Sequence, residues 1–141
     1  EAYGSATAVI ARTKEVIESG IETSLKERAS DLDTIGAKVV AEEAQKGDAA
    51  AMKIIIDTAK YLAIGIATLM HTVDPDAIYI GGAMTFGGND SELGRTFMQA
   101  IRDEIKIRAL PTCSATTIVD FAELGGDAGF IGAAGIAKAL G

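Results

Sequence analysis

Residues 74–82, Asp-Pro-Asp-Ala-Ile-Tyr-Ile-Gly-Gly, constrain the fold more than any other stretch of the chain. A long helical pattern runs into them, and Pro75 ends it because proline lacks an N–H and drives the preceding residue out of helical geometry. The uncharged, β-branched and aromatic run at 77–80 predicts a strand covered on both faces. Gly81 and Gly82 then allow either a tight turn or the close approach of a ligand. Ligands of open α/β sheets bind beyond the carboxyl ends of strands, which makes this pair a candidate contact.

The same order of helix, proline, strand and glycine corner recurs later in the chain. Pro111 precedes a strand predicted over residues 116–121, and a glycine-rich corner follows at 125–129. A helical crossover between two such strands predicts parallel pairing with a right-handed connection. Neither strand alternates polar and apolar residues, so both are expected to have neighbours on each side. The sequence therefore predicts an α/β fold with an incomplete sheet, and we expect this chain to be a fragment of a longer protein.

Helices account for most of the remaining chain. Ser5 is the expected cap of a helix that reaches about Glu18, and Asp48 is the expected cap of a helix over residues 49–73. The longer helix should be buried most of the way round in its C-terminal half, where Gly65 suggests a second backbone passing close by. A helix over 34–46 is expected to be capped by Asp33, and one over 89–108 by a capping box of Asn89 and Glu92. A last helix is expected over 130–140. Residues 21–32 should be a connector or a short exposed helix.

Composition excludes several classes of function. The 141 residues include 13 basic and 20 acidic side chains, giving a net charge of −7, and no stretch is rich in lysine or arginine. Such a surface repels nucleic acid and anionic membranes, so we expect neither as a partner of this segment. Cys113 is the single cysteine, which leaves no internal disulfide and fits a reducing cytoplasm.

Familiar phosphate-binding motifs are absent from the sequence. No Gly-Lys-Ser/Thr follows the glycines at 81–88, and no Gly-x-Gly-x-x-Gly opens a helix. Two glycine corners at the ends of adjacent parallel strands can still approach a nucleotide jointly. The second corner, at 125–129, also opens a helix, whose N-terminus favours anions.

Other chemically active side chains are interpreted as structural. His71 has no histidine or cysteine partner at metal-ligand spacing, and Cys113 lies beside a proline, so both are expected to serve packing. The joint at Gly47 and Asp48 does not predict a DNA-reading helix, because the next helix begins with alanines that cannot contact base edges. The acidic pairs Glu42/Glu43 and Asp103/Glu104 are expected to lie on solvated helix faces.

Several motifs occur in an order that resembles a known family. Glu1-Ala2-Tyr3-Gly4-Ser5 is followed by Gly47-Asp48 before a long helix, then by Val-Asp-Pro-Asp-Ala-Ile-Tyr-Ile-Gly-Gly at 73–82 and by Leu-Gly-Gly-Asp-Ala-Gly-Phe-Ile-Gly-Ala-Ala at 124–134. This set resembles the C-terminal lobe of the ROK family of repressors, open-reading-frame proteins and sugar kinases, within the actin/hexokinase superfamily. The resemblance covers essentially the whole chain.

The resemblance implies a ribonuclease H-like lobe and a set of site residues. Glu1 matches a glutamate that binds sugar hydroxyls, and Gly81 and Gly82 match the pair that approaches the nucleotide. Gly125 and Gly126 match the turn into the last helix and are assigned to nucleotide binding with that pair. Gly126 stands where the family usually has aspartate. ATP and Mg²⁺ are the implied cofactors of the parent protein, together with zinc, whose cysteine ligands are not in this sequence.

From the resemblance we expect residues 1–141 to be one domain, the C-terminal lobe of a glucokinase-like, ATP-dependent hexose kinase. The phosphate loop and the catalytic aspartate of the family are not in this sequence, so no catalytic residue is assigned here and the fragment alone is expected to be inactive. The alternatives are the sugar-sensing lobe of a ROK repressor and a dimerisation lobe whose ligand site has decayed. Because its sheet lacks neighbours, the chain is expected to form a homo-oligomer or to expose apolar surface.

Overall fold

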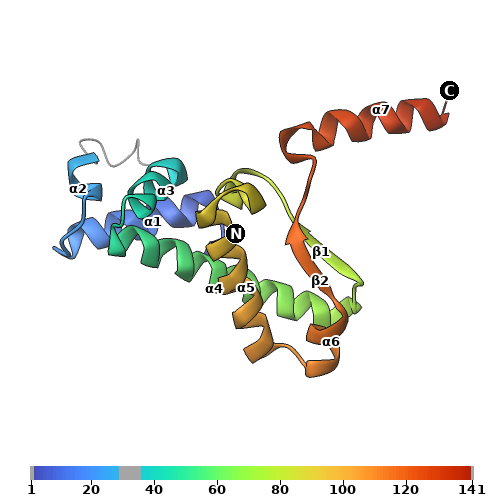
Figure 1. The fold of residues 1–141 in the computed structure, drawn as a ribbon, viewed down its shortest axis with the longest axis horizontal. Helices are drawn as coiled ribbons and strands as arrows, with labels where there is room; N and C mark the ends of the chain where they lie inside the picture. The colour runs from blue at the N-terminus through green and yellow to red at the C-terminus, as the bar shows by residue number, and fades with distance from the viewer. Residues whose placement is uncertain (1, 29–35, 141) are drawn as a thin grey trace.

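The computed structural model describes residues 2–28 and 36–140, and in these ranges a group of packed helices adjoins a small parallel sheet (Figure 1). The elements follow the order α1 (Ala6–Glu18), α2 (Leu25–Arg28), α3 (Ala37–Gln45), α4 (Ala49–Val73), β1 (Ala77–Ile80), η2 (Ala83–Thr85), η3 (Gly88–Asp90), α5 (Glu92–Arg108), α6 (Pro111–Thr116), β2 (Ile118–Phe121), η4 (Gly125–Asp127) and α7 (Ala128–Leu140). The predicted α/β class is therefore confirmed, although helix predominates.

Two predicted helix caps are confirmed by their hydrogen bonds. The Ser5 hydroxyl accepts from the backbone N–H of Ala8 at 3.2 Å, and the Asp48 carboxylate accepts from that of Ala51 at 2.9 Å. At the other end of α4, Asp74 takes the left-handed conformation with φ +44°. Pro75 excludes a further helical turn there, so the helix ends where the proline predicts.

Other predicted boundaries are displaced. The cap of α5 is Ser91, whose hydroxyl accepts from the N–H of Gly94, and not Asn89, which lies in the preceding turn. Pro111 does not lead directly into the strand but begins α6, because a proline in the first helical turn has no N–H to leave unpaired. The second strand consequently begins only at Ile118, after α6. The helix predicted over 34–46 begins at Ala37 with Gly36 as its cap, and Asp33 lies outside the described residues.

The core is centred on α4, which packs against α1, α3 and α5. Of the described helices, α4 alone is long and apolar enough to cross a membrane, yet its stripe at Ile54, Ile55, Ala59, Ala63, Ile66 and Met70 is buried in this core. The expectation that its C-terminal half is buried most of the way round is wrong for the described residues. Ile64, Leu69 and Val73 are 39%, 51% and 65% exposed. A Cβ added at Gly65 would meet no atom of the described residues within 4 Å, so none of their backbone passes close to it.

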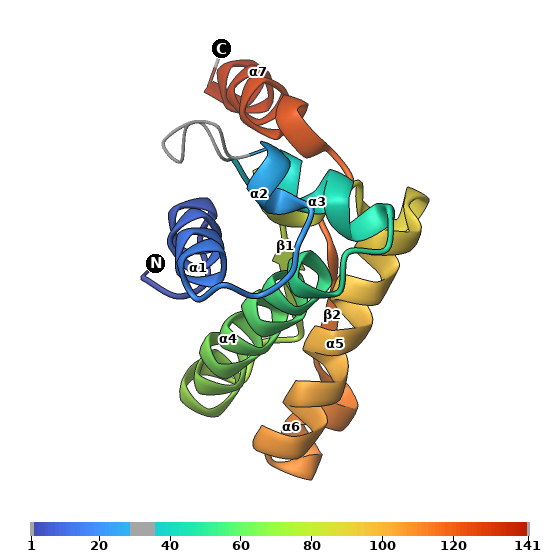
Figure 2. The same cartoon turned by 90° about the vertical axis from the view of Figure 1, so that its left-hand side faces the viewer.

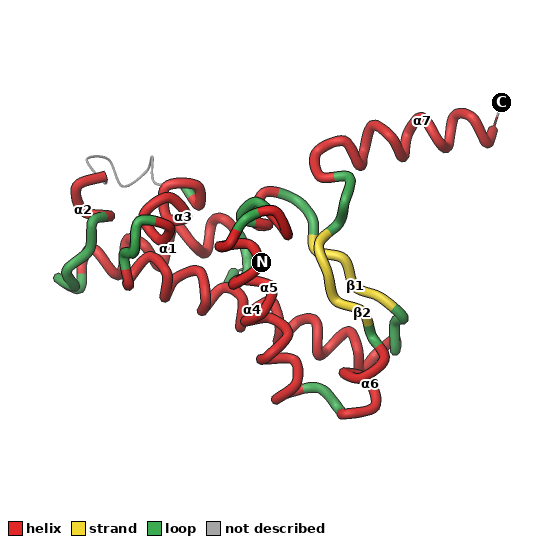
Figure 3. Tube along the Cα trace, in the orientation of Figure 1, coloured by secondary structure: helices red, strands yellow, loops and turns green. Residues whose placement is uncertain are grey.

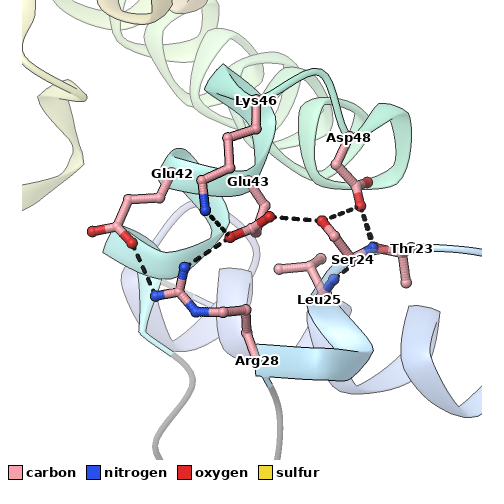
Figure 4. A network of polar contacts seen from close by, with 8 residues as sticks. All are labelled: Thr23, Ser24, Leu25, Arg28, Glu42, Glu43, Lys46 and Asp48. Carbon is pink, nitrogen blue, oxygen red and sulfur yellow. Dashed lines mark hydrogen bonds and ion pairs between the residues drawn. The ribbon is translucent and has the colours of Figure 1, made fainter.

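A network of charged and hydroxyl groups joins α2, α3 and the start of α4 (Figure 4). Glu43 is only 4% exposed and accepts hydrogen bonds from Arg28, Lys46 and Ser24, each at 2.8 Å. The interpretation of Glu42 and Glu43 as a solvated pair is therefore wrong for Glu43. Residues 21–28 are likewise more than an exposed connector, because Leu25 of α2 is fully buried. Sequence spacing alone does not show that α2 folds back onto α3.

The two strands form a parallel pair in which Ile78 lies opposite Val119 and Ile80 opposite Phe121 (Figure 3). These four side chains face the helices and pack with the core. The other face carries Tyr79, 62% exposed, and Ile118, 57% exposed. The parallel pairing is confirmed, while the prediction that both faces are covered is wrong among the described residues.

The last helix, α7, projects away from the rest of the molecule (Figures 1 and 2). None of its residues, Ala128–Leu140, is buried, and Phe130 and Leu140 are 76% and 85% exposed. Apolar side chains surround this helix, which carries a single charge at Lys138. A helix that is apolar on all sides is stable in water only when a neighbour covers it.

Candidate functional site

A hollow of about 690 Å³ opens at the carboxyl ends of β1 and β2. This is the position at which open parallel sheets bind their ligands, and the volume lies within the range of small-molecule sites. The hollow brings together three of the predicted site residues, Gly81, Gly82 and Gly125. Gly126 follows Gly125 in η4, and its assignment to the site stays a prediction. The remaining lining residues are Thr85, Gly87, Gly88, Asn89, Asp90, Phe121, Ala122 and Glu123.

The glycines expose backbone to the hollow. Gly82 has φ +85° and Gly125 has φ +49°, conformations that favour glycine. A Cβ added at Gly82 or Gly125 would meet no described atom within 4 Å, and one at Gly81 would meet only the Cβ of Ala122 at 3.6 Å. These positions therefore lack side chains although the protein leaves room for them. A bound group can occupy that room and contact the main chain.

The electrostatic character of the hollow is acidic. Asp90 and Glu123 contribute carboxylates, and the described lining residues include no lysine, arginine or histidine. Carboxylates accept hydrogen bonds from hydroxyl and amino groups and repel phosphates. The lining is therefore better suited to a polyol or to the nucleoside end of a nucleotide than to a polyphosphate.

One wall of the hollow, formed by residues 86–90, is hydrogen-bonded to β2. The Asn89 amide donates to the Asp120 carboxylate at 3.1 Å, and the backbone N–H of Phe121 donates to the same oxygen at 2.8 Å. These two donors, aided by Arg102, lower the pKa of Asp120. Asp120 is thus a charged acceptor at neutral pH and does not itself line the hollow.

The predicted sugar ligand, Glu1, lies outside the described residues. The segment that follows it is held by Arg12, which donates to the carbonyl oxygen of Tyr3 at 2.9 Å and lies 5.3 Å from the centre of the Tyr61 ring. Tyr3 stacks on Tyr61 with ring centroids 5.1 Å apart. These contacts connect the start of the described chain to α4. The role of Glu1 in sugar binding stays a prediction.

The remaining candidate residues have structural contacts. The ring Nε2 of His71 accepts from the backbone N–H of Leu110 at 3.0 Å and so joins α4 to the start of α6. Cys113 is half-buried against the core, and Asp103 and Glu104 form ion pairs with Lys106 and Arg108. In the described ranges, no three side chains of histidine, cysteine, aspartate or glutamate gather closely enough to hold a metal ion.

Sequence reasoning missed the polar lining residues Asn89, Asp90 and Glu123. A signal for Glu123 was present, since it follows the second strand at the edge where Gly81 follows the first. Asn89 was interpreted as a helix cap, and its place in the wall depends on the conformation of the two preceding glycines, which no periodicity shows.

Comparison with known proteins identifies relatives along the whole chain. The sequence model of the ROK family matches residues 1–140. A glucokinase from Halalkalibacterium halodurans is 32% identical over 141 residues, an alignment that covers 98% of this chain and 40% of the glucokinase.

Two solved structures have the same fold. A ROK family glucokinase from Streptomyces griseus in complex with glucose and AMPPNP superposes with a TM-score of 0.76 at 26% identity, covering 96% of this chain and 43% of that one. A ROK family transcriptional regulator, a homologue of the Escherichia coli MLC protein, superposes with a TM-score of 0.68 at 20% identity, covering 86% and 29%. The chain spans less than half the length of each of these proteins.

Proposed function

This chain belongs to the ROK family, and we propose that it is the C-terminal lobe of a glucokinase-like kinase that transfers phosphate from ATP to a hexose hydroxyl. Its fold is that of the ROK sugar kinases, the actin/hexokinase fold. In this proposal the hollow beyond β1 and β2 holds the nucleoside end of ATP. Gly81, Gly82, Gly125 and Gly126 provide backbone contacts, and Glu1 binds the sugar.

The observation that carries the proposal is the meeting of Gly81, Gly82 and Gly125 around one hollow. These residues come from two corners more than 40 positions apart in sequence, and the parallel pairing brings the corners to the same edge of the sheet. The relative solved with glucose and AMPPNP supports a nucleotide and a sugar as ligands of this family lobe. The parent is proposed to be a cytoplasmic enzyme.

The residues present fit the nucleoside part of ATP. Asp90 and Glu123 can accept hydrogen bonds from ribose hydroxyls or a base amino group, and the absent Cβ atoms leave the main chain accessible. ATP supplies the phosphoryl group, and positive charge for its phosphates has to come from Mg²⁺ and from residues outside this lining. A zinc ion does not fit the described residues, which offer no cluster of ligands, so no step is assigned to zinc.

The decisive experiment is a measurement of ADP release by the complete protein with Mg-ATP and, in turn, glucose, fructose, mannose and N-acetylmannosamine. Turnover with one sugar supports the kinase and names the acceptor. The 141-residue chain alone should show none. Absence of turnover with every sugar, in a protein that still binds one of them, would favour the second candidate below.

Gly81→Val tests whether the hollow is the nucleotide site. The backbone of Gly81 is not left-handed, and its Cβ would make only an ordinary contact with Ala122, so the variant should fold. The larger side chain occupies the hollow, and we expect the KM for ATP to rise at least about tenfold with little change in the KM for sugar. Unchanged nucleotide binding would instead support a dimerisation lobe with a decayed site.

A sugar-responsive repressor is the second candidate function. It is favoured by the likeness of this lobe to a ROK family transcriptional regulator with a TM-score of 0.68. In that case the sugar would be sensed and not phosphorylated, and DNA would be bound by a part of the protein other than this acidic lobe. Binding of an operator by the complete protein, released by sugar without ADP production, would establish it.

Self-association of the lobe is a further part of the proposal. The exposed apolar residues on α4, including Leu69 and Val73, and on the open face of the sheet, Tyr79 and Ile118, support a homo-oligomer. Light scattering of the chain should show a dimer. If the chain is monomeric, it should bind an apolar dye, which fluorescence measures. A monomer that binds no such dye would contradict this part alone.

A further inference from the structure

The wall of the hollow between β1 and α5 has an unusual backbone. Phe86, Gly87 and Gly88 are consecutive and all have positive φ, at +51°, +88° and +61°. A left-handed phenylalanine is strained, and strained residues persist only where their surroundings hold them. Here the Phe86 ring is buried edge-on against Phe97, with centroids 4.8 Å apart, and the Ser91 hydroxyl donates to the Phe86 carbonyl.

The wall rests directly on the first turn of α5. A Cβ added at Gly94 would lie 2.1 Å from the carbonyl oxygen of Gly88, closer than any real contact allows. Gly94 is therefore the residue that lets the wall sit against the helix. Arg95, one residue later, donates from Nη1 to the Asn89 carbonyl at 2.9 Å. The side of the wall that faces α5 is thus fixed by packing and by hydrogen bonds from the Ser91 and Arg95 side chains to backbone carbonyls.

A different contact fixes the wall to the sheet. The Asn89 side chain reaches from the wall to Asp120 of β2, the residue opposite Tyr79 in the pairing. The other carboxylate oxygen of Asp120 lies 3.5 Å from the Arg102 guanidinium, which also donates to the Val119 carbonyl. Asp120 therefore joins three elements, η3, β2 and α5, with a side chain that is 38% exposed.

We infer that Asp120 is a positioning residue for nucleotide binding, which through Asn89 holds the strained wall at 86–90 in the shape that receives the nucleoside. The inference rests on the proposed function of the hollow. A wall that is set before the ligand arrives spares the ligand the cost of ordering it. Phe86 is held by Phe97 and Ser91, and the hydrogen bond from Asn89 to Asp120 adds a second attachment three residues later in the wall.

The test compares kinetic constants of the complete enzyme carrying Asp120→Ala or Asn89→Ala. Each change removes the bond to the wall, and we expect the KM for ATP to rise about tenfold, the factor that a hydrogen bond to a charged group typically contributes. The KM for sugar and the kcat should stay within about twofold, and the melting temperature close to that of the wild type. The double variant should bind ATP no more weakly than Asp120→Ala, because both lack the same hydrogen bond between Asn89 and Asp120.

Two further variants serve as controls. Asp120→Asn keeps an oxygen that accepts from Asn89 and should restore most of the affinity for ATP. Asp103→Ala removes an exposed carboxylate of α5 that bonds only Gln99 and Lys106 among the described contacts, and should change neither KM. If Asp120→Ala is poorly folded, Asn89→Ala carries the test alone, because it removes the same hydrogen bond by truncating an exposed side chain.

The outcomes separate this inference from the proposed function. Wild-type enzyme that binds no nucleotide overturns the function and the inference with it. Nucleotide binding in the wild type with an unchanged KM for ATP in Asp120→Ala and Asn89→Ala overturns the inference alone. A fall in melting temperature with equal changes in both KM values would show that Asp120 merely stabilises the strand.

Discussion

The helical end of this molecule, α1 to α4, and the sheet end, β1 to α7, differ in how far their side chains are buried and how their polar groups are paired. At the helical end Val9, Leu25, Val40 and Ile55 are fully buried, and a polar network around Glu43 pairs its charges. At the sheet end one strand face and the whole of α7 are exposed, and consecutive left-handed residues line a hollow. The helical end is thus covered by its own contacts and by α5, which completes the core against α4, while exposed backbone and uncovered surface lie around the strands and α7.

The largest effect that separates the two ends should come from Ile55→Ala. Ile55 is fully buried in α4, so removal of its side chain leaves a cavity at the centre of the core. We expect the free energy of unfolding to fall by about 3 kcal/mol. Urea unfolding of the chain, followed by circular dichroism, measures the change.

Ile136→Ala is the matched control for that substitution. The same side chain is 64% exposed in α7, and its loss should change the unfolding free energy of the chain by less than about 0.5 kcal/mol. A cost comparable to that of Ile55→Ala would show that α7 packs against the body in solution, and would remove the contrast between the ends.

Asp48→Ala should have an intermediate and pH-dependent effect. Partial burial raises the pKa of Asp48, but the backbone N–H of Ala51 and donors from Thr23 and Ser24 outweigh it and hold the pKa at about 2. A carboxylate whose pKa is lowered on folding stabilises the protein above its unfolded pKa, and this contribution is lost as the pH falls from about 4 to about 2. At neutral pH the substitution should cost about 1–2 kcal/mol.

The sign of that prediction can be checked by measuring stability against pH. The difference between wild type and Asp48→Ala should be constant at neutral pH and shrink in the acid range. Asp48→Asn keeps a capping oxygen and should lose less stability than the alanine variant. A difference that instead grows on acidification would contradict the assignment of Asp48 as an ionised cap.

The smallest effect is expected for Ile118→Thr on the open face of the sheet. Ile118 is 57% exposed, and threonine keeps the β-branched shape that strands favour. The unfolding free energy of the chain should change by less than about 0.5 kcal/mol. In the complete protein, a larger cost would indicate that another element covers this face there.

Local signals in the sequence were enough for the helical frame and the two strands. Ser5 and Asp48 were recognised as caps because a cap acts within three residues of itself, and Pro75 marked the end of α4 for the same reason. The signals were misleading where a contact is distant in sequence. Leu25 and Glu43 are buried because α2 folds back onto α3, and no local pattern contains that information.

The sequence was enough to predict where the candidate site lies in the fold, but not which polar side chains line it. The glycines at 81, 82 and 125 indicated the correct edge of the sheet, because parallel strands end on the same side. Asn89 and Asp90 reach that edge only through the left-handed turns before them. Ligand contacts of those glycines and of Glu1 stay a prediction. The covering of the sheet was overestimated, because an uncharged strand shows that its faces can be buried but not whether residues of the same chain bury them.

The separation of paired residues along the chain has a consequence for synthesis on the ribosome. The hydrogen bonds that join the α2 segment to α3 and to the start of α4 link residues 14 to 25 positions apart, such as Arg28 with Glu42 and Thr23 with Asp48. The bonds that bring β2 to β1 link residues 42 positions apart, as Thr117 with Pro75. Closing the longer loop costs more entropy and must wait until β2 has emerged. The polar network of α2, α3 and the start of α4 can therefore close before the binding edge is assembled, whereas α1 joins α4 through Arg12 and Thr58, which are 46 positions apart.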